Sequence, residues 1–221
     1  MIVVQDLSLR IGSFVMDGVQ LRVSTGQYGV LMGKTGSGKT TLLESIAGLK
    51  KVDQGRIVLG DRDVTHLRPA ERGIGYVPQD GALFATMTVR QHLTFALRIR
   101  KSGQREMSHR VDQIAELLSI GHLLDRKPMG LSGGERQRVA FGRALSFEPA
   151  VLLLDEPLSA LDDETRHQMY DVIRRVRQHT GVTTLHVTHN QQETAELADV
   201  VFEMEDGRVS ETKKQEETND R

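Results

Sequence analysis

The sequence predicts an α/β fold with a mostly parallel sheet, an antiparallel β subdomain at the N-terminus and an inserted α-helical subdomain. Short, apolar, β-prone runs at 28–32 and 151–154 have the character of strands that a parallel sheet buries on both faces. Looser alternation at 2–11 and 15–23 is typical of paired antiparallel strands. Residues 88–146, between the two sheet-forming parts, change to helical spacing and indicate the insertion.

Composition bounds the possible functions. The 221 residues are enough for one large domain, or for a domain that carries a subdomain. The 29 basic and 30 acidic residues nearly balance, so no broad affinity for nucleic acid is expected. The absence of cysteine excludes disulfides, thiolate zinc sites and a cysteine nucleophile. The N-terminus has no basic signal-peptide region and no apolar run is long enough to cross a bilayer, so we expect a soluble, intracellular protein that acts at a membrane only through a partner.

The first predicted hairpin has strands at 2–11 and 15–23 and a turn at Gly12 and Ser13. Phe14 lies at the tip of this hairpin, in a chain with six phenylalanines, three tyrosines and no tryptophan. Two interpretations stay open. The ring is either a small hydrophobic plug or a platform on which a nucleobase stacks.

A glycine-rich stretch follows the strand at 28–32 and precedes a helix predicted for 39–49. It matches the pattern G-x-x-x-x-G-K-S/T at every position, continues into Thr41, and consists of Gly33, Lys34, Thr35, Gly36, Ser37, Gly38, Lys39 and Thr40. Glycines let backbone N–H groups surround phosphates, and the helix dipole adds about half a positive charge at the helix start. Lys39 is placed to reach the β- and γ-phosphates, and Thr40 to offer its hydroxyl to Mg²⁺. The sequence therefore predicts a nucleoside triphosphate site.

Further strands are predicted at 56–64, with a turn, and at 73–77. Pro78 ends the second of these because proline cannot donate to a ladder. Gln79 lies just beyond, at the edge where open α/β sheets bind ligands. It is either an ordinary loop residue or, given the phosphate loop, a ligand of a metal ion and its water.

The helical block contains two segments of interest. The basic connector 98–105 is either a solvated loop or a contact for a partner or for lipid headgroups. Ser132 is a candidate N-cap, and Gly133 and Gly134 leave backbone N–H groups open at a helix start. These residues predict a second anion-binding helix terminus.

Two carboxylates follow the buried strand at 151–154. Asp155 and Glu156 either mark the exit of the chain to solvent or have chemical roles beside the phosphate loop. In the second interpretation Asp155 is a ligand of Mg²⁺ and its water, and Glu156 is a general base. Asp162 closes the loop that caps a helix from Asp163 onward, whose acidic start and basic end suit the helix dipole.

His189 comes two residues after a strand predicted at 182–187. It is either structural or placed to touch a γ-phosphate. A last strand is expected at 200–204 and a polar tail at 211–221. The α/β core with its β subdomain is thus predicted at about 1–87 and 147–210, and the helical subdomain at about 88–146.

In this order the motifs resemble the nucleotide-binding subunits of ATP-binding cassette (ABC) transporters over essentially the whole chain. The six matching elements are the phosphate loop, Gln79, residues 131–137, residues 151–156, Ser159-Ala160-Leu161-Asp162, and His189. The resemblance implies a P-loop NTPase (RecA-like) core that binds ATP with Mg²⁺ and hydrolyses it. Gln79 would couple the nucleotide to a membrane partner, Glu156 would be the catalytic base, and His189 the switch histidine.

The resemblance also implies an assembly. Asp162 would organise the interface of a homodimer, in which Ser132, Gly133 and Gly134 bind the γ-phosphate on the opposite subunit. Phe14 would stack on adenine, although many relatives carry that aromatic residue nearer Ile11. Among the departures from the family, Gly81 stands where relatives often have an aromatic residue, and Lys34 and Thr35 replace the commoner Pro-Ser.

Residues 73–89 and 122–140 are most similar to the ATPases of bacterial and archaeal importers, those for molybdate or tungstate in particular. Polyamine, sulfate and sugar importers share much of this sequence. The resemblance implies import of a small solute such as an inorganic oxyanion, with integral membrane permease subunits, a solute-binding protein and a place at the cytoplasmic face of the cell membrane. The alternative is an ABC ATPase of DNA maintenance or repair, which would carry a long heptad-repeat insertion or zinc-binding cysteines; this chain has neither.

Overall fold

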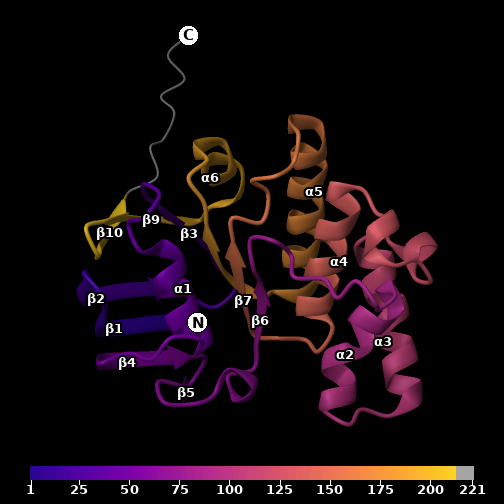
Figure 1. The fold of residues 1–221 in the computed structure, drawn as a ribbon, viewed down its shortest axis with the longest axis horizontal. Helices are drawn as coiled ribbons and strands as arrows, with labels where there is room; N and C mark the ends of the chain where they lie inside the picture. The colour runs from indigo at the N-terminus through magenta and orange to yellow at the C-terminus, as the bar shows by residue number, and fades with distance from the viewer. Residues whose placement is uncertain (213–221) are drawn as a thin grey trace.

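The central element of the fold is a six-stranded sheet with the strand order β10-β9-β3-β8-β7-β6 (Figure 1). The computed structural model describes residues 1–212. All neighbouring strands of this sheet run parallel except the terminal pair β9 and β10. The strands are β3 (Tyr28–Met32), β6 (Ile74–Val77), β7 (Val151–Asp155), β8 (Thr183–Val187), β9 (Val200–Glu205) and β10 (Arg208–Thr212).

A second sheet of four antiparallel strands has the order β2-β1-β4-β5. Its strands are β1 (Ile2–Ile11), β2 (Phe14–Val23), β4 (Gln54–Leu59) and β5 (Arg62–Asp63). Alternate apolar residues of β1 and β2 are buried, as expected for a sheet with one face on a core.

Helices pack on both faces of the six-stranded sheet. They are α1 (Lys39–Ala47), α2 (Val89–Ile99), α3 (Gln104–Leu117), α4 (Gly133–Leu145), α5 (Asp163–Thr180) and α6 (Gln191–Leu197). Helix α1 lies between the two sheets, where Leu42, Leu43 and Ile46 share one core with apolar residues of β1, β7 and β8. Alternate residues of β3 and β7 point to the opposite core, which contains apolar residues of α2, α3, α4 and α5. Because β3 and β7 contribute to both cores, nearly all of their residues are apolar.

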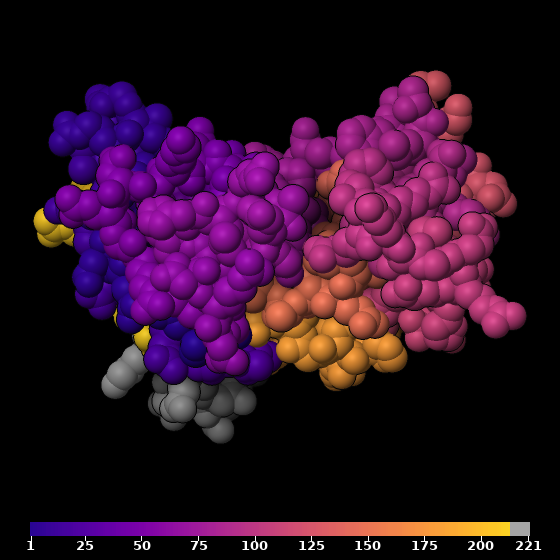
Figure 2. Space-filling view, turned by 90° about the horizontal axis from the view of Figure 1, so that it is seen from below, coloured from indigo at the N-terminus to yellow at the C-terminus, as the bar shows by residue number. Residues whose placement is uncertain are grey.

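The β-rich part and the helices α2 and α3 form two lobes of the surface, with residues of the later half of the chain exposed in the hollow between them (Figure 2). Three short 3₁₀ segments, at Pro69–Glu71, Gly121–Leu123 and Pro128–Gly130, connect the longer elements. Within residues 1–212 no helix is both long and apolar enough to span a membrane.

The predicted fold class is confirmed: a mostly parallel sheet, an antiparallel β sheet at the N-terminus and inserted helices are all present. The division of the chain at residues 87 and 147 remains a prediction. Phe14 is a correction of detail, because it is the first residue of β2, paired with Ile11, rather than a residue between strands.

The C-terminal elements were predicted incompletely. Helix α6 and strand β10 were not foreseen. Strand β10 includes Glu211 and Thr212, the first two residues of the polar tail predicted at 211–221. The rest of that tail, 213–221, lies outside the described residues.

Candidate functional site

The glycine-rich loop joins the carboxyl end of β3 to the start of α1, as the sequence predicted. Lys34, Thr35 and Gly36 are exposed, whereas Lys39 is buried at the helix start. Gly38 is the N-cap of α1 and has φ +104°, a conformation that residues with a Cβ rarely adopt. Because this cap has no side chain that bonds to the helix, the first N–H groups of α1 stay available to an anion.

Lys39 lies inside the loop that precedes it. Its Nζ donates to the carbonyl oxygens of Gly33 and Lys34, each at 2.8 Å, which uses two of its three N–H donors. Burial lowers the pKa of Lys39, while Glu156 and Asp155 oppose this shift. The Oγ of Ser37 is buried without a hydrogen-bond partner among the described residues. A cation, an open helix start and a free hydroxyl in one loop fit a phosphate group.

Phe14 lies directly against this loop. A Cβ added to Gly38 would be 2.3 Å from Cζ of the Phe14 ring, so the ring packs on the helix cap. The ring is half-buried, and Ile11, its partner across the β1–β2 pair, is 42% exposed. Phe14 is therefore the aromatic side chain that the β1–β2 hairpin brings to the phosphate loop.

Asp155 is the last residue of β7 and is almost completely buried. Its Oδ1 accepts a hydrogen bond of 3.0 Å from the hydroxyl of Thr40, the first-turn residue of α1 that the motif predicts as a metal ligand. Burial raises the pKa of Asp155, and Glu156 and Glu44 raise it further, whereas the Thr40 hydrogen bond opposes this. The structure thus brings together two oxygen groups that are 115 residues apart in the sequence.

Tyr76 is a residue that the sequence analysis missed. It lies on β6 beside β7, and burial, followed by the charges of Asp155 and Glu44, raises the pKa of its phenol. The signal available in the sequence was its place three residues before Gln79, near the carboxyl end of a predicted strand.

These residues fit Mg²⁺. Magnesium prefers oxygen ligands and is usually held by one or two protein groups together with phosphate oxygens and water. Thr40 and Asp155 supply a hydroxyl and a carboxylate at adjacent positions. Among residues 1–212 no cluster of three or more histidine or acidic side chains could hold a metal ion, so a full protein cage of that kind is not offered in the described part.

Glu156 follows Asp155 and has φ +43°, an uncommon value for a residue other than glycine. Its N–H donates to the carbonyl of Val187 at the end of β8. Its Oε2 lies 3.3 Å from Nδ1 of His189, whose side chain is 58% exposed. Glu156 and His189, predicted separately from the ends of two strands, therefore form a pair at the same sheet edge as the phosphate loop.

A buried polar network supports the segment that carries His189. The Thr188 hydroxyl donates to Oε2 of Glu193 at 2.7 Å and accepts from the N–H of Asn190. The same carboxylate oxygen lies 3.3 Å from Nε2 of His186, which is completely buried. Although burial opposes it, contacts with His186, Thr188 and Arg166 leave the pKa of Glu193 lowered. Sequence reasoning missed this network, because a glutamate in a short helix is usually exposed.

Gln79 is exposed just beyond β6, and among the described residues no hydrogen bond joins it to the Thr40–Asp155 pair. Its assignment as a metal and water ligand stays a prediction. The turn that follows it, residues 80–82, packs on α4.

The predicted second anion site begins α4. Ser132 is the N-cap: its Oγ accepts from the Glu135 N–H, and its own N–H donates to the Glu135 carboxylate. Gly134 packs so closely on Thr165 that an added Cβ would lie 2.5 Å from the methyl group. Asp162 caps α5 by accepting from the N–H and the hydroxyl of Thr165, and these bonds lower its pKa. Both predicted caps are confirmed, and they lie side by side.

This second site does not meet the phosphate loop of its own chain. Among the described residues no hydrogen bond or ion pair joins residues 132–135 to residues 33–41. Figure 1 shows α1 beside the antiparallel sheet and α4 among the inserted helices.

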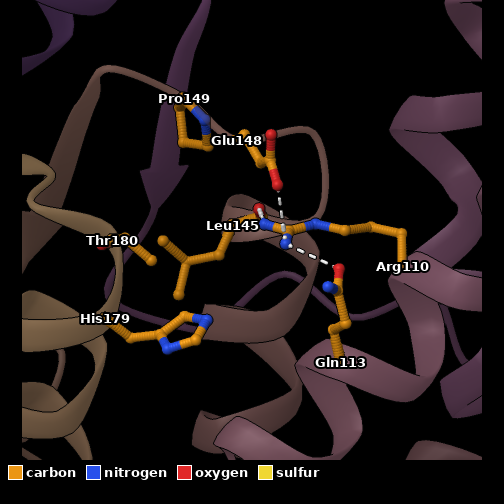
Figure 3. Close-up of a pocket in the computed structure, with 7 residues that line it drawn as sticks. All are labelled: Arg110, Gln113, Leu145, Glu148, Pro149, His179 and Thr180. Carbon is orange, nitrogen blue, oxygen red and sulfur yellow. Dashed lines mark hydrogen bonds and ion pairs between the residues drawn. The ribbon is translucent and has the colours of Figure 1, made fainter.

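A cavity of about 250 Å³ lies elsewhere, at the amino ends of β7 and β8 and therefore opposite the loop edge of the sheet (Figure 3). Arg110 is its most buried charged side chain, and it bonds to the backbone at the end of α4 and to Glu148. The lining residues are Arg110, Gln113, Leu145, Glu148, Pro149, His179 and Thr180.

Comparison with known proteins places this geometry in context. The family model described as "ABC transporter" matches residues 16–159. The molybdate/tungstate import ATP-binding protein of Thermococcus kodakarensis is 44% identical over 208 residues, which cover 94% of this chain and 63% of the relative. The sulfate/thiosulfate import ATP-binding protein of Nocardia farcinica is 41% identical over 222 residues, which cover 100% of this chain and 67% of the relative. The chain thus spans about two thirds of the length of these relatives.

Solved structures have the same fold. A dimeric ATP-binding cassette in a post-hydrolysis state, bound to ADP and Pi, matches with a TM-score of 0.83 and 26% identity, covering 96% of this chain and 98% of that one. A nucleotide-free cassette from an ABC transporter matches with a TM-score of 0.84 and 27% identity, covering 96% and 90%.

Proposed function

Because the chain belongs to the ABC transporter family, we propose that it binds and hydrolyses ATP as the energy-providing subunit of a transport system. One observation carries the proposal. The phosphate loop with Lys39, the Thr40–Asp155 pair and the Glu156–His189 pair all lie at the carboxyl edge of one sheet. That edge is where open α/β sheets bind their ligands.

The loop residues hold the triphosphate in this proposal. N–H groups of the loop and of the first turn of α1 bond to phosphate oxygens, and Lys39 places its charge at the β- and γ-phosphates. Phe14 stacks on the adenine from its position against Gly38. Thr40 and Asp155 would hold Mg²⁺, and Gln79 would be the third protein ligand of the ion. When bound, the ion neutralises charge on the phosphate oxygens.

Glu156 acts as the general base. Its carboxylate accepts a proton from water while the water oxygen forms a bond to the γ-phosphorus, and the bond from that phosphorus to the bridging oxygen breaks to leave ADP and phosphate. His189, 3.3 Å from Glu156, orients the carboxylate and contacts the γ-phosphate. The tight backbone at Glu156, with φ +43°, fixes where the carboxylate can point.

The complete site needs two copies of the chain in this proposal. Ser132, Gly133 and Gly134 contact the γ-phosphate bound to the other copy, with Asp162 at the interface beside them. Support comes from the separation of these residues from their own phosphate loop and from the dimeric cassette of similar fold.

The transported solute is proposed from the relatives. Both import proteins compared above are named for inorganic oxyanions, molybdate or tungstate and sulfate or thiosulfate. We therefore propose import of a small oxyanion, with permease subunits in the membrane, a solute-binding protein outside, and this chain at the cytoplasmic face.

The catalytic proposal is tested by ATP hydrolysis and nucleotide binding. The wild-type protein should release phosphate from ATP in the presence of Mg²⁺. Lys39→Ala should lose both binding and hydrolysis, because its ammonium is the buried cation of the loop, whereas Lys34 is exposed. Glu156→Gln should bind ATP but hydrolyse it at least about a hundredfold more slowly, since an amide cannot accept the proton.

Lys51→Ala is the matched control, because it removes an exposed lysine that follows α1 and lies outside the loop. It should leave both measurements unchanged. Normal hydrolysis by Lys39→Ala protein would overturn the assignment of the site.

A further inference from the structure

The turn after Gln79 is seated on one face of α4. Gly81 N–H donates to the Pro78 carbonyl, and Ala82 N–H donates to Oδ1 of Asp80, so the turn is closed by its own bonds. A Cβ added to Gly81 would lie 3.6 Å from Ala140 and 3.8 Å from Gln137. The turn therefore faces α4 across a gap that one added methyl group would fill.

Arg143 fixes the turn to this face by hydrogen bonds. Its two terminal nitrogens donate to the carbonyl oxygens of Gly81, at 3.1 Å, and of Ala82. Burial lowers the pKa of Arg143, while the Asp80 carboxylate opposes the shift. Gln137 lies on the same face, but its amide nitrogen has no partner among the described residues. The hydrogen bonds that hold the turn to α4 thus come from Arg143.

A second contact fixes the far end of the same segment. The N–H of Phe84 donates to Nε2 of His92, which is completely buried, and Nδ1 of His92 bonds to the carbonyl of Thr88. The rings of Phe84 and His92 stack with centroids 5.9 Å apart. Because the Thr88 carbonyl can only accept, Nδ1 carries the proton and Nε2 is the acceptor. The segment 80–84 is therefore held by α4 at one end and by α2 at the other.

The C-terminal part of α4 packs closely on both α2 and β6. An added Cβ on Gly142 would lie 2.6 Å from Leu93 of α2, and one on Gly75 of β6 would lie 2.5 Å from the Ala144 carbonyl. Arg143 comes eleven positions after Ser132, which corresponds to roughly 16 Å along the helix axis. A displacement of the N-terminus of α4 is therefore transmitted to the turn that Arg143 holds.

We propose that Arg143 is the positioning residue that couples the 132–134 turn to the segment after Gln79. The coupling rests on the proposed function, in which Ser132 touches the nucleotide of a second copy and Gln79 touches the nucleotide of its own chain. Each α4 then connects the two nucleotide sites of a dimer. When the nucleotide of the second copy binds to Ser132, α4 moves and Arg143 moves the turn with it. Gln79 then reaches the position in which it touches the nucleotide of its own chain.

The test separates binding from turnover. Arg143→Ala removes both hydrogen bonds to the turn. Arg143→Lys keeps the charge but replaces the guanidinium, which donates from two nitrogens, by a single ammonium. ATP affinity of the monomer should stay within about threefold of wild type in both, because the phosphate loop makes no contact with Arg143. kcat should fall about ten- to a hundredfold in Arg143→Ala and less in Arg143→Lys, as expected when a catalytic group is misplaced.

Hydrogen exchange of residues 80–87 supplies the readout on the turn itself. In Arg143→Ala the amides of Ala82 and Phe84 should exchange about tenfold faster, since a charged hydrogen bond no longer closes the segment. Arg110→Ala is the matched control: Arg110 donates to the Leu145 and Ser146 carbonyls at the end of α4, and no hydrogen bond among the described residues joins it to the turn. It should loosen the end of α4 without changing kcat or exchange at 80–87.

The outcomes separate the two proposals. A wild-type protein that fails to bind ATP contradicts the proposed function, whereas an active wild type with kcat unchanged in both Arg143 variants overturns the coupling. An equal loss of kcat in Arg110→Ala also overturns it, because any loosening of α4 would then suffice. If Arg143→Ala does not fold, Arg143→Lys decides by the same measurements.

Discussion

At the scale of single residues, two neighbours at the end of β7 face very different surroundings. Asp155 is buried against Thr40, and burial raises the pKa of its carboxyl group. Glu156, one position further, has a partly exposed carboxylate beside His189. The end of β7 can therefore supply a metal ligand and a base at adjacent positions, because Asp155 is the last strand residue and the chain turns at Glu156, which has φ +43°.

The position of Phe14 gives a residue-scale prediction. If the ring stacks on adenine, Phe14→Ala should weaken ATP binding by about 1–3 kcal/mol, and Phe14→Trp should retain it. The measurement is an equilibrium titration with ATP. Because stacking involves any base, GTP should bind appreciably to the wild type and lose affinity in parallel.

Two comparisons separate stacking from support of the loop. Inorganic tripolyphosphate has no base, so its affinity should not change in Phe14→Ala. An equal loss of tripolyphosphate binding would mean that the ring, which packs on Gly38, only holds the loop in shape. Ile11→Ala tests the neighbouring strand position, and a larger loss there than in Phe14→Ala would move the stacking role to Ile11.

At the scale of elements, both ends of α1 depend on close tertiary contacts. Its start carries the phosphate loop, and its end faces Arg72, a buried arginine of the segment after β5. The guanidinium of Arg72 donates to the carbonyls of Ser45 and Ile46 in the last turn of α1, and to those of Thr65 and Leu67. A cation at this end satisfies carbonyls that the helix leaves unpaired and suits the helix dipole.

Gly48 should therefore be less tolerant of substitution than other helix ends. It caps α1 with φ +82°, and an added Cβ would lie 2.5 Å from Nε of Arg72. Gly181 caps α5 with φ +61° but has open space around it. We expect Gly181→Ala to cost about 1–2 kcal/mol, the usual penalty of the left-handed conformation. Gly48→Ala should cost at least about 1 kcal/mol more, because Arg72 must also move.

Urea unfolding of the two variants measures this difference. A smaller penalty for Gly48→Ala when Arg72→Ala is also present would identify the arginine as the cause. Equal losses of unfolding free energy in Gly48→Ala and Gly181→Ala would show that the end of α1 adjusts without cost, contrary to the contact seen here.

At the scale of the whole molecule, the 132–134 turn and the phosphate loop belong to different parts of the fold. The 132–134 turn belongs to the inserted helices, whereas the phosphate loop leads into α1, which lies between the two sheets (Figure 1). Two anion-binding helix starts that do not meet within one chain can share one nucleotide only between two copies, and a two-fold axis lets each copy complete the site of the other. The interface is then formed by the same surfaces of both copies.

The assembly prediction follows. Nucleotide bound between two copies stabilises the dimer by mass action, and hydrolysis removes the shared γ-phosphate. The protein should be monomeric without nucleotide, and Glu156→Gln should become dimeric with ATP because it binds without turnover. Light scattering at equal protein concentration measures both states.

Ser132→Arg should abolish the dimer of Glu156→Gln while ATP binding by the monomer persists, because the new side chain would enter the other copy's site. Ser210→Arg is the matched control, since it adds the same group at an exposed position of β10. A Glu156→Gln protein that binds ATP and stays monomeric would contradict dimerisation of the isolated chain and make it dependent on the membrane partner.

The features that short stretches of chain encode could be predicted without the structure. The phosphate loop and the caps at Ser132 and Asp162 depend on residues within a few positions of one another, so their patterns survive without knowledge of the fold. The order of these motifs also determined the fold class. Helix α6 and strand β10 escaped prediction because both are short and largely polar, and β10 forms only by pairing with β9 at the edge of the sheet.

The contacts between groups far apart in the chain became known from the folded structure alone. Arg143 bonds to Gly81 across 62 residues, Arg72 to Ile46 across 26, and Thr40 to Asp155 across 115. An arginine can pair with any carbonyl, so its presence in the sequence does not indicate its partner. Backbone preferences are local and can be read from neighbours in the chain, whereas these contacts arise when packing of the two cores brings remote segments together.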